Sequence, residues 1–336
     1  MAQPPLRVIT RSSARARIDA ALAALPPDGP IIIIGGTRAA ADDAARQRAS
    51  ARTATAGLSR FSLLQFAARY ALVPLAHVGR TPSTGAVSDA VAARAVDALC
   101  RESALKYFAP VAETPGFPLA LARTVAESRQ VAVDAGQLRA VGRVGGDLSA
   151  LLAHFEQALD QAGVSDRADL YKTAAHAVRG RRLGAAVLLL DVPCEDPSSQ
   201  ELIEAIVASA DIVVVTVAPG DDLRWLPAHE VIGDPDSDEA ISDLACVRRY
   251  LFASGSPDPR QLDGGLECFS APGEGRECIE IARRIQRDAR RGVRFDDIAV
   301  LVRTPAAYVG LLEHAFVRAG IPPWFDQRSE EHTSEL

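Results

Sequence analysis

A threonine and an arginine, Thr37 and Arg38, stand at the start of a predicted helix, shortly after a run of isoleucines. A hydroxyl group, a guanidinium group and the free N–H groups of a helix N-terminus together form a reasonable phosphate site. Any solvated helix start offers similar groups, so the pattern alone leaves a purely structural role open. The ligand group that it indicates is a phosphate.

Metal and nuclease chemistry find little support among the remaining residues. The five cysteines contain no CxxC pair and the six histidines show no metal-ligand spacing, so neither a zinc site nor a disulfide framework is predicted. The only lysines, Lys106 and Lys172, are preceded two positions earlier by Ala104 and Leu170. The [DE]-x-K triplet of many metal-dependent nucleases is therefore absent. We expect no catalytic residue and no metal ion in this chain.

Length and composition bound the class of protein. A chain of 336 residues with 48% hydrophobic and 24% charged residues is expected to form two or three globular units. No apolar run approaches the roughly 20 residues that span a bilayer, and residues 1–10 show no secretory signal, so we expect a cytoplasmic protein without membrane contact. The net charge of −6 excludes an evenly basic surface but permits a local basic groove.

Apolar periodicity predicts the elements that must position Thr37 and Arg38. Residues 6–10 and 31–34 are predicted strands, each followed by a predicted helix, and two such units in succession indicate a parallel α/β sheet. Strand signals vanish from about 63 to 171, where helical periodicity predicts an α-helical insertion. Sheet character returns at 185–191 and 211–217, so the first domain is predicted to be discontinuous.

The rest of the chain is predicted to hold a connector and a second α/β unit. Its predicted elements are a helix at 238–252 in a connector rich in Pro, Asp, Gly and Ser, helices at 275–290 and 306–319, and strands at 298–302 and 322–325. Residues 328–336, RSEEHTSEL, look like a translated sequencing adapter, and we expect the natural protein to continue. The first domain, called lobe 1A here, is predicted to comprise residues 1–74 and 166–226, with the insertion at 75–165. The connector is predicted at 227–265, and the start of the second unit, called lobe 2A, is predicted at 266–327.

The order of these elements resembles a superfamily 1 helicase of the UvrD type, and more closely the inactivated, AddB-like subunits of bacterial helicase-nucleases. The resemblance implies a P-loop-NTPase-like, RecA-like parallel sheet with the helical insertion, followed by the start of a second helicase lobe. Active relatives carry a GxxxxGK[ST] loop where residues 10–17 read TRSSARAR. Without glycines the backbone cannot curl around phosphates, and without lysine nothing neutralises them.

Two further segments of the resemblance concern the nucleotide. Residues 186–193, AVLLLDVP, match the strand that delivers a magnesium-binding Asp and a catalytic Glu, and here Asp191 is followed by Val192. Residues 213–222 match the next motif but lack its glutamine. Residues 273–325 resemble the opening of the second motor domain, with Arg303 at the position of an arginine that reaches the γ-phosphate. The resemblance thus implies a vestigial nucleotide pocket, lined by Ser12, Arg17, Asp191 and Arg303.

The resemblance also implies a DNA-contacting face. Residues 36–46, GTRAAADDAAR, resemble a TxxAAxxxxxR segment that contacts single-stranded DNA, although the second arginine comes one residue early. Residues 61–69, FSLLQFAAR, occupy the position of the next DNA-facing segment. Thr37, Arg38, Arg60 and Phe61 are the predicted nucleic-acid-binding residues, with Phe61 either stacking on a base or lying in the core.

The function that the resemblance implies is a non-catalytic DNA-binding and scaffold part of a double-strand-break-repair subunit. Its expected partners are single-stranded or duplex-end DNA and an active, AddA-like helicase-nuclease subunit. No cofactor is expected here, because ATP and magnesium binding are predicted to be lost. A PD-(D/E)XK exonuclease, its magnesium and an iron-sulfur cluster would lie downstream. The alternatives are a weakly active DNA-dependent ATPase, an unrelated α/β enzyme, or a truncated product that does not fold stably.

Overall fold

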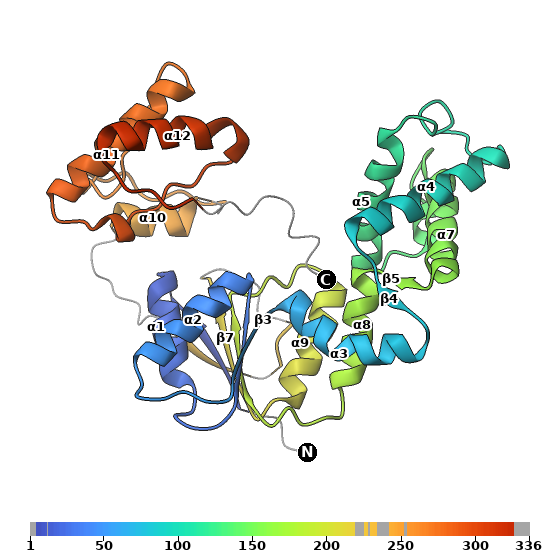
Figure 1. Ribbon diagram of the computed structural model, residues 1–336, viewed down its shortest axis with the longest axis horizontal. Helices are drawn as coiled ribbons and strands as arrows, with labels where there is room; N and C mark the ends of the chain where they lie inside the picture. Colours follow the sequence, from blue (N-terminus) through green and yellow to red (C-terminus); the bar gives the residue numbers. More distant parts are fainter. Residues whose placement is uncertain are drawn as a thin grey trace. The chain divides into compact units, whose positions relative to one another are not determined.

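The computed structural model describes residues 5–11, 13–218, 225–227, 229–233, 242–251 and 254–325, without the side chains of residues 248 and 249 (Figure 1). The described residues form two compact units, the first up to residue 239 and the second from residue 240. Residues 326–336, which include the adapter-like tail, lie outside the described part. Each unit is considered by itself below.

The first unit is built on a six-stranded sheet in which every recorded pairing is parallel. The strand order is β3-β2-β6-β7-β1-β8. The strands are β1 (Leu6–Thr10), β2 (Ile31–Gly35), β3 (Leu58–Ser62), β6 (Ala186–Leu190), β7 (Ile212–Val217) and β8 (Glu230–Gly233). Crossover helices between parallel strands define an α/β fold consistent with the RecA-like class, as predicted. The edge strands β3 and β8 were not predicted.

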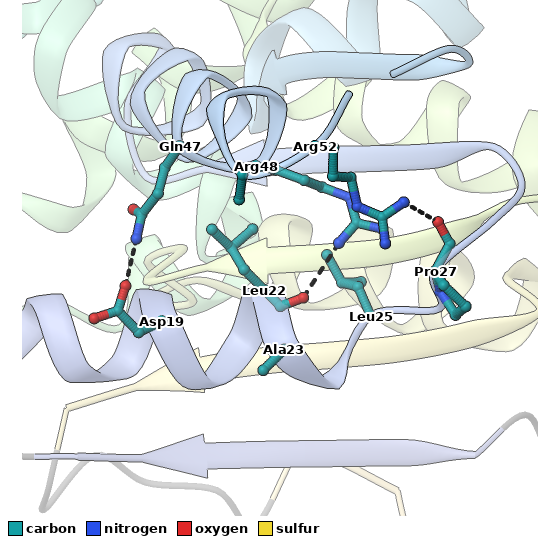
Figure 2. A pocket seen from close by; sticks show the side chains of 9 residues that line it. Asp19, Leu22, Ala23, Leu25, Pro27, Gln47, Arg48 and Arg52 are labelled. Carbon is teal, nitrogen blue, oxygen red and sulfur yellow. Dashed lines mark hydrogen bonds between the residues drawn. The ribbon is translucent and has the colours of Figure 1, made fainter. Parts of the chain in front are cut away.

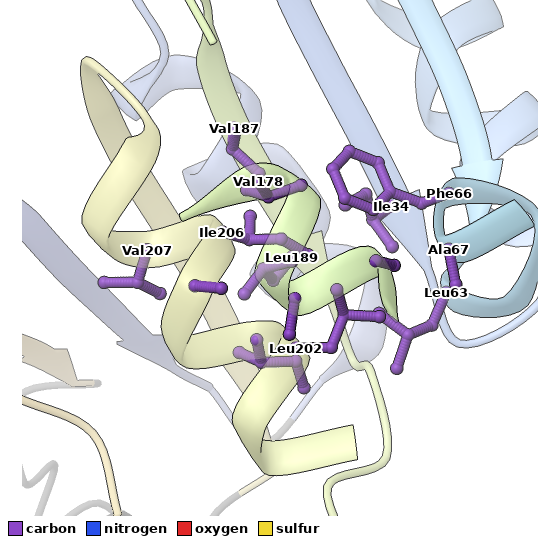
Figure 3. Packing of buried hydrophobic residues seen from close by; sticks show 14 of the residues in the cluster. Ile34, Leu63, Phe66, Ala67, Val178, Val187, Leu189, Leu202, Ile206 and Val207 are labelled. Carbon is purple, nitrogen blue, oxygen red and sulfur yellow. The ribbon is translucent and has the colours of Figure 1, made fainter. Parts of the chain in front are cut away.

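Helices cover both faces of this sheet, because successive strand residues point to opposite sides. Val187 and Leu189 face a core formed with α3 (Leu63–His77), α8 (Arg167–Val178) and α9 (Pro197–Ser209), shown in Figure 3. Leu188 and Leu190 face a second core formed with α1 (Ala14–Ala24) and α2 (Arg38–Ser50). Burial on both sides explains why the central strands read as uninterrupted apolar runs.

The predicted helical insertion between β3 and β6 is confirmed and has its own core. Its helices are α4 (Gly85–Arg101), α5 (Gly116–Gln130), α6 (Ala135–Arg139) and α7 (Gly145–Ala162). The chain enters and leaves through two short parallel strands, β4 (Thr81–Pro82) and β5 (Val164–Ser165). Leu151, Leu152 and Phe155 of α7 are at most 1% exposed, so α7 supplies the centre of this core. The exact limits of the insertion stay a prediction.

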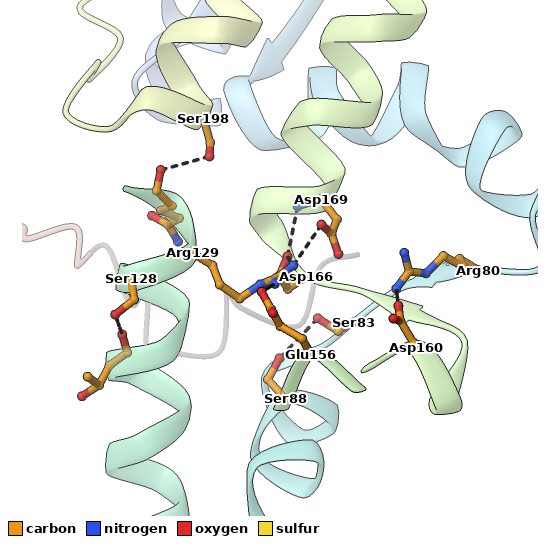
Figure 4. Close-up of polar contacts among 12 residues, drawn as sticks. Arg80, Ser83, Ser88, Ser128, Arg129, Glu156, Asp160, Asp166, Asp169 and Ser198 are labelled. Carbon is orange, nitrogen blue, oxygen red and sulfur yellow. Dashed lines mark hydrogen bonds and ion pairs between the residues drawn. The ribbon is translucent and has the colours of Figure 1, made fainter. Parts of the chain in front are cut away.

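One arginine ties the insertion to the sheet-covering helices (Figure 4). The Arg129 side chain, 13% exposed, donates from Nε to Asp166 at 2.5 Å and from Nη2 to Asp169 at 3.0 Å, and it also pairs with Glu156 of α7. Asp166 additionally caps α8 by accepting from the Asp169 N–H at 3.0 Å. Burial, and then the neighbouring Asp166 carboxylate, raise the pKa of Asp169. Helices α5, α7 and α8 are thereby fixed at one buried point.

The second unit contains α10 (Asp243–Tyr250), α11 (Glu274–Arg290), a 3-10 turn (Phe295–Asp297) and α12 (Pro305–Ala319). Helix α12 ends at Gly320 in the left-handed conformation (φ 66°), as its sequence predicts. The prediction of strands at 298–302 and 322–325 is wrong, because the structure assigns no strand in the described part of this unit. A strand requires ladder hydrogen bonds from a neighbour. Leu301 and Trp324 remain 91% and 84% exposed.

Part of the predicted connector is held by a buried aspartate of the second unit. Asp243, 2% exposed, accepts hydrogen bonds from the backbone N–H groups of Asp263 at 2.9 Å and Gly264 at 3.0 Å, and it pairs with Arg260. These hydrogen bonds lower the pKa of Asp243 despite the opposing effect of burial. A helix is predicted at 238–252, and α10 is the part of it that the structure describes as helical. The limits of the connector stay a prediction.

Candidate nucleic-acid interface

The candidate site lies where the parallel strands of the first unit end. Because all the strands run the same way, the segments that follow β1, β2 and β6 come together at the carboxyl ends of the strands. This end of the sheet is called the carboxyl edge below. Arg17 of α1, Thr37 and Arg38 at the start of α2, and Asp191 directly after β6 are all brought there. Ser12 lies outside the described residues.

An ion pair between a buried arginine and an exposed aspartate joins two of the predicted pocket residues, Arg17 and Asp191. Arg17 donates from Nε to Asp191 Oδ1 at 3.2 Å and from Nη2 to Oδ2 at 2.8 Å, a two-point contact between a guanidinium and a carboxylate. The Arg17 side chain is 10% exposed and that of Asp191 is 37% exposed. Arg17 also donates from Nη1 to the Arg11 carbonyl at 2.7 Å. The loop after β1 therefore presents the Arg11 carbonyl oxygen to the Arg17 guanidinium. A phosphate-binding loop would instead present backbone N–H groups to the phosphate.

Thr216 on β7 completes the environment of Asp191. The fully buried Thr216 hydroxyl donates to Asp191 Oδ1 at 2.6 Å and accepts from the Asp191 backbone N–H at 2.9 Å. Asp191 itself has a positive φ of 45°, an uncommon conformation for a residue with a side chain. Both carboxylate oxygens thus have protein donors. A magnesium ion would have to displace a two-point guanidinium contact to bind there.

The residue that directly follows Asp191 carries no acidic group. Val192 packs against the core on the α3, α8 and α9 side of the sheet. Burial raises the pKa of the Cys194 thiol to about 11, so this cysteine stays protonated and is a poor nucleophile at neutral pH. Among the residues that the structure describes, no three His, Cys, Asp or Glu side chains are placed to hold a metal ion.

Two glycines, which have no side chains, allow the start of α2 to lie close to the segment that carries Asp191. A Cβ atom on Gly36 would lie 2.5 Å from the Asp191 carbonyl oxygen, and one on Gly35 would lie 2.6 Å from the Thr37 carbonyl oxygen. The Gly36 N–H donates to the Leu190 carbonyl at 3.0 Å. The predicted DNA-contacting turn and the segment that carries Asp191 are therefore in direct backbone contact.

Two of the predicted DNA-binding arginines meet at one carboxylate. Arg38 Nε lies 3.0 Å and Arg60 Nε lies 2.7 Å from Asp42 Oδ1. Arg38 also donates from Nη1 to Gln65 Oε1 at 3.2 Å. Their side chains are 40% and 50% exposed, so two guanidiniums share one negative charge at the surface. The cluster keeps an excess positive charge beside the N-terminus of α2, an arrangement that can bind phosphate.

The other predicted site residues are less directly placed for binding. Thr37 is exposed, and its hydroxyl caps α2 by accepting from the Ala40 N–H at 3.2 Å. Phe61 is half-buried against the core, with its ring edge-on to Phe66 at a centroid distance of 6.1 Å. Arg303 is an exposed residue of the second unit, and its role stays a prediction.

Three residues of this edge were missed in the sequence. Asp42 and Gln65 organise the two arginines, and Thr216 organises Asp191. The spacing of Arg38 and Asp42, four residues apart on a helix, could have revealed their ion pair. Thr216 and Gln65 become visible only when the strands and helices pack.

These features define a class: a RecA-like parallel α/β domain in which an internal ion pair and a small basic cluster lie at the carboxyl ends of the strands. No protein-family profile matches the chain. Over 90 residues, 26% of the chain, it is 33% identical to an ATP-dependent helicase/deoxyribonuclease subunit of Pelotomaculum thermopropionicum. The matched segment covers 8% of that protein's length. The chain is therefore distantly similar to a helicase-nuclease subunit over a small part of its length.

None of the helices in the described part of the chain combines the length and the apolar character that crossing a membrane requires.

Proposed function

We propose that the first unit is a helicase-like lobe that binds single-stranded DNA and does not use ATP. The observation that carries the proposal is the two-point Arg17–Asp191 ion pair at the nucleotide edge. An active lobe of this kind needs that edge open, because phosphoryl transfer depends on a metal-binding carboxylate and on donors that cradle the phosphates. Here the carboxylate is engaged by the protein itself. A weakly active ATPase is the less favoured alternative.

The DNA-binding part of the proposal rests on the cluster of Arg38, Arg60 and Asp42. Its excess positive charge lies at the carboxyl edge, next to a helix N-terminus, on a chain whose overall charge is −6. A single-stranded backbone carries one charge per nucleotide, and a few arginines along it are sufficient for salt-sensitive binding without sequence preference.

We assign this lobe to a double-strand-break-repair helicase-nuclease, and the partial similarity to a helicase/deoxyribonuclease subunit supports this assignment. The lobe would guide the strand, while an active partner subunit would supply ATP-driven movement. Any nuclease activity would belong to a part of the subunit other than the described residues, in which no cluster suited to a metal ion is present.

Replacing Arg38 and Arg60 together by alanine is expected to weaken binding of a single-stranded oligonucleotide about tenfold at low salt. Loss of two phosphate contacts should also reduce the slope of log affinity against log salt by roughly 1.4. Fluorescence anisotropy over a salt series measures both quantities. Asp42→Asn, which removes the competing carboxylate, is expected to strengthen binding about threefold.

The control for this experiment is the double variant Arg101→Ala and Arg182→Ala, which removes the same charge from two exposed arginines paired with Asp97 and Asp211. It should bind like the unmodified chain. Equal affinities for both double variants would show that the cluster does not contact DNA, and we would withdraw the interface.

A further inference from the structure

A pocket lined by charged residues lies between α1 and α2, at the end of the sheet where the strands begin (Figure 2). It has a volume of about 430 Å³ and is formed where α1 ends and the chain leads into β2. Leu22, Ala23, Leu25 and Pro27 give it an apolar side, and Arg48 and Arg52 project into it from the end of α2. None of these residues belongs to the Arg17–Asp191 edge.

The two arginines are held in place by neutral acceptors. Arg48 donates from Nη1 to the Leu22 carbonyl at 3.2 Å and from Nη2 to the Pro26 carbonyl at 2.5 Å. Arg52 donates from Nη1 to the Pro27 carbonyl. The bond to Leu22 caps the last turn of α1, which carries the negative end of its dipole, and the other two bonds hold the segment that follows the helix. The guanidiniums are therefore preorganised, and several of their N–H groups take no part in these bonds.

Neither arginine has an acidic partner among the described residues, although the chain holds 43 acidic side chains. Arg48 is only 5% exposed, and burial followed by repulsion from Arg52 lowers its pKa. Asp19, the acid that lines the pocket, is bonded to Gln47 instead. A buried cation without a counter-ion is unfavourable, and a negatively charged ligand would relieve that cost.

We propose that this pocket binds an acidic segment of a protein partner, with a carboxylate facing Arg48 and Arg52 and an adjacent apolar side chain on Leu22 and Leu25. A peptide suits the site because the lining is partly apolar, and because planar guanidiniums bind carboxylates at two points. A nucleic-acid backbone would require a longer basic track. This surface adds a partner site to the proposed DNA-binding lobe and does not depend on it.

A synthetic peptide with the repeat Leu-Glu-Leu-Glu, carrying a neutral dye, tests the proposal with the whole chain. Saturable binding is expected by fluorescence anisotropy, and Arg52→Gln is expected to weaken it at least about fivefold. Arg52 is exposed, so this variant should fold. Arg46→Gln, on the same helix but paired with Asp43, is the matched control and should bind normally. The corresponding Leu-Gln-Leu-Gln peptide should not bind.

Three results would overturn the proposal: no saturable binding of the acidic peptide up to about 1 mM, equal binding by Arg52→Gln and Arg46→Gln, or displacement of the peptide by a thymidine oligonucleotide. The last result would assign the pocket to nucleic acid. Melting curves of each variant, measured alongside, exclude loss of fold as the cause of lost binding. Failure of DNA binding by the Arg38 and Arg60 cluster would leave this result unaffected.

Discussion

Replacing Arg17 by methionine is expected to lower the free energy of unfolding of the first unit by about 2–3 kcal/mol. The substitution keeps an unbranched, apolar stem but leaves Asp191 without its two-point partner. Removal of one member of a fully buried pair costs about 3–5 kcal/mol, and we lower this range because Asp191 is 37% exposed. Urea unfolding followed by the fluorescence of Trp225, which packs against the first core, measures the loss.

Arg15→Met is the matched control for this variant, because Arg15 is exposed on the same helix. Its unfolding free energy should stay within about 0.5 kcal/mol of the unmodified chain. A double-mutant cycle with Asp191→Asn should give a coupling energy of about 1–2 kcal/mol. Equal stabilities of Arg17→Met and Arg15→Met would show that the ion pair does not hold this edge together.

Replacing Asp147 by alanine is expected to destabilise the helical insertion by about 3–4 kcal/mol. The Asp147 carboxylate is 6% exposed, and its Oδ2 accepts from the backbone N–H groups of Lys106, Tyr107 and Phe108 at 3.0, 2.8 and 3.0 Å. Alanine would leave three donors without their acceptor and would release the segment that follows α4. Hydrogen exchange of those three amides measures the effect directly.

Two companion variants separate this effect from simple loss of charge. Asp147→Asn keeps an acceptor oxygen and should lose about half as much stability as alanine. Asp97→Ala removes an exposed carboxylate paired with Arg101 on α4 and should be nearly neutral. Protection of the three amides that is unchanged in Asp147→Ala would contradict the assigned role.

The fold of the first unit could be predicted because its central strands are buried on both faces. The isoleucine run of β2 and the run AVLLL of β6 admit few other interpretations, and their following helices carry clear N-caps at Thr37 and Asp196. The edge strand β3, LSRFS, escaped prediction because polar residues interrupt it and none of its residues is fully buried. In the second unit, apolar residues at 298–302 resembled a strand although none is assigned there.

The candidate site was predicted in part. The sequence showed that glycines and lysine are missing from residues 10–17 and that Val192 follows Asp191. It did not show that Arg17 would occupy the carboxylate, because the two residues are 174 positions apart and only the sheet brings them together. The shared carboxylate of Asp42 and the uncompensated pair Arg48 and Arg52 likewise depend on how helices pack.

The most direct test of the central claim is a phosphate-release assay on the purified chain with ATP, magnesium and single-stranded DNA. The closed Arg17–Asp191 edge predicts no DNA-stimulated release, and it predicts the same background for the unmodified chain and for Asp191→Asn. Release that DNA stimulates and that Asp191→Asn abolishes would contradict the account, because it would require Asp191 to leave Arg17 and bind the metal of a working nucleotide site.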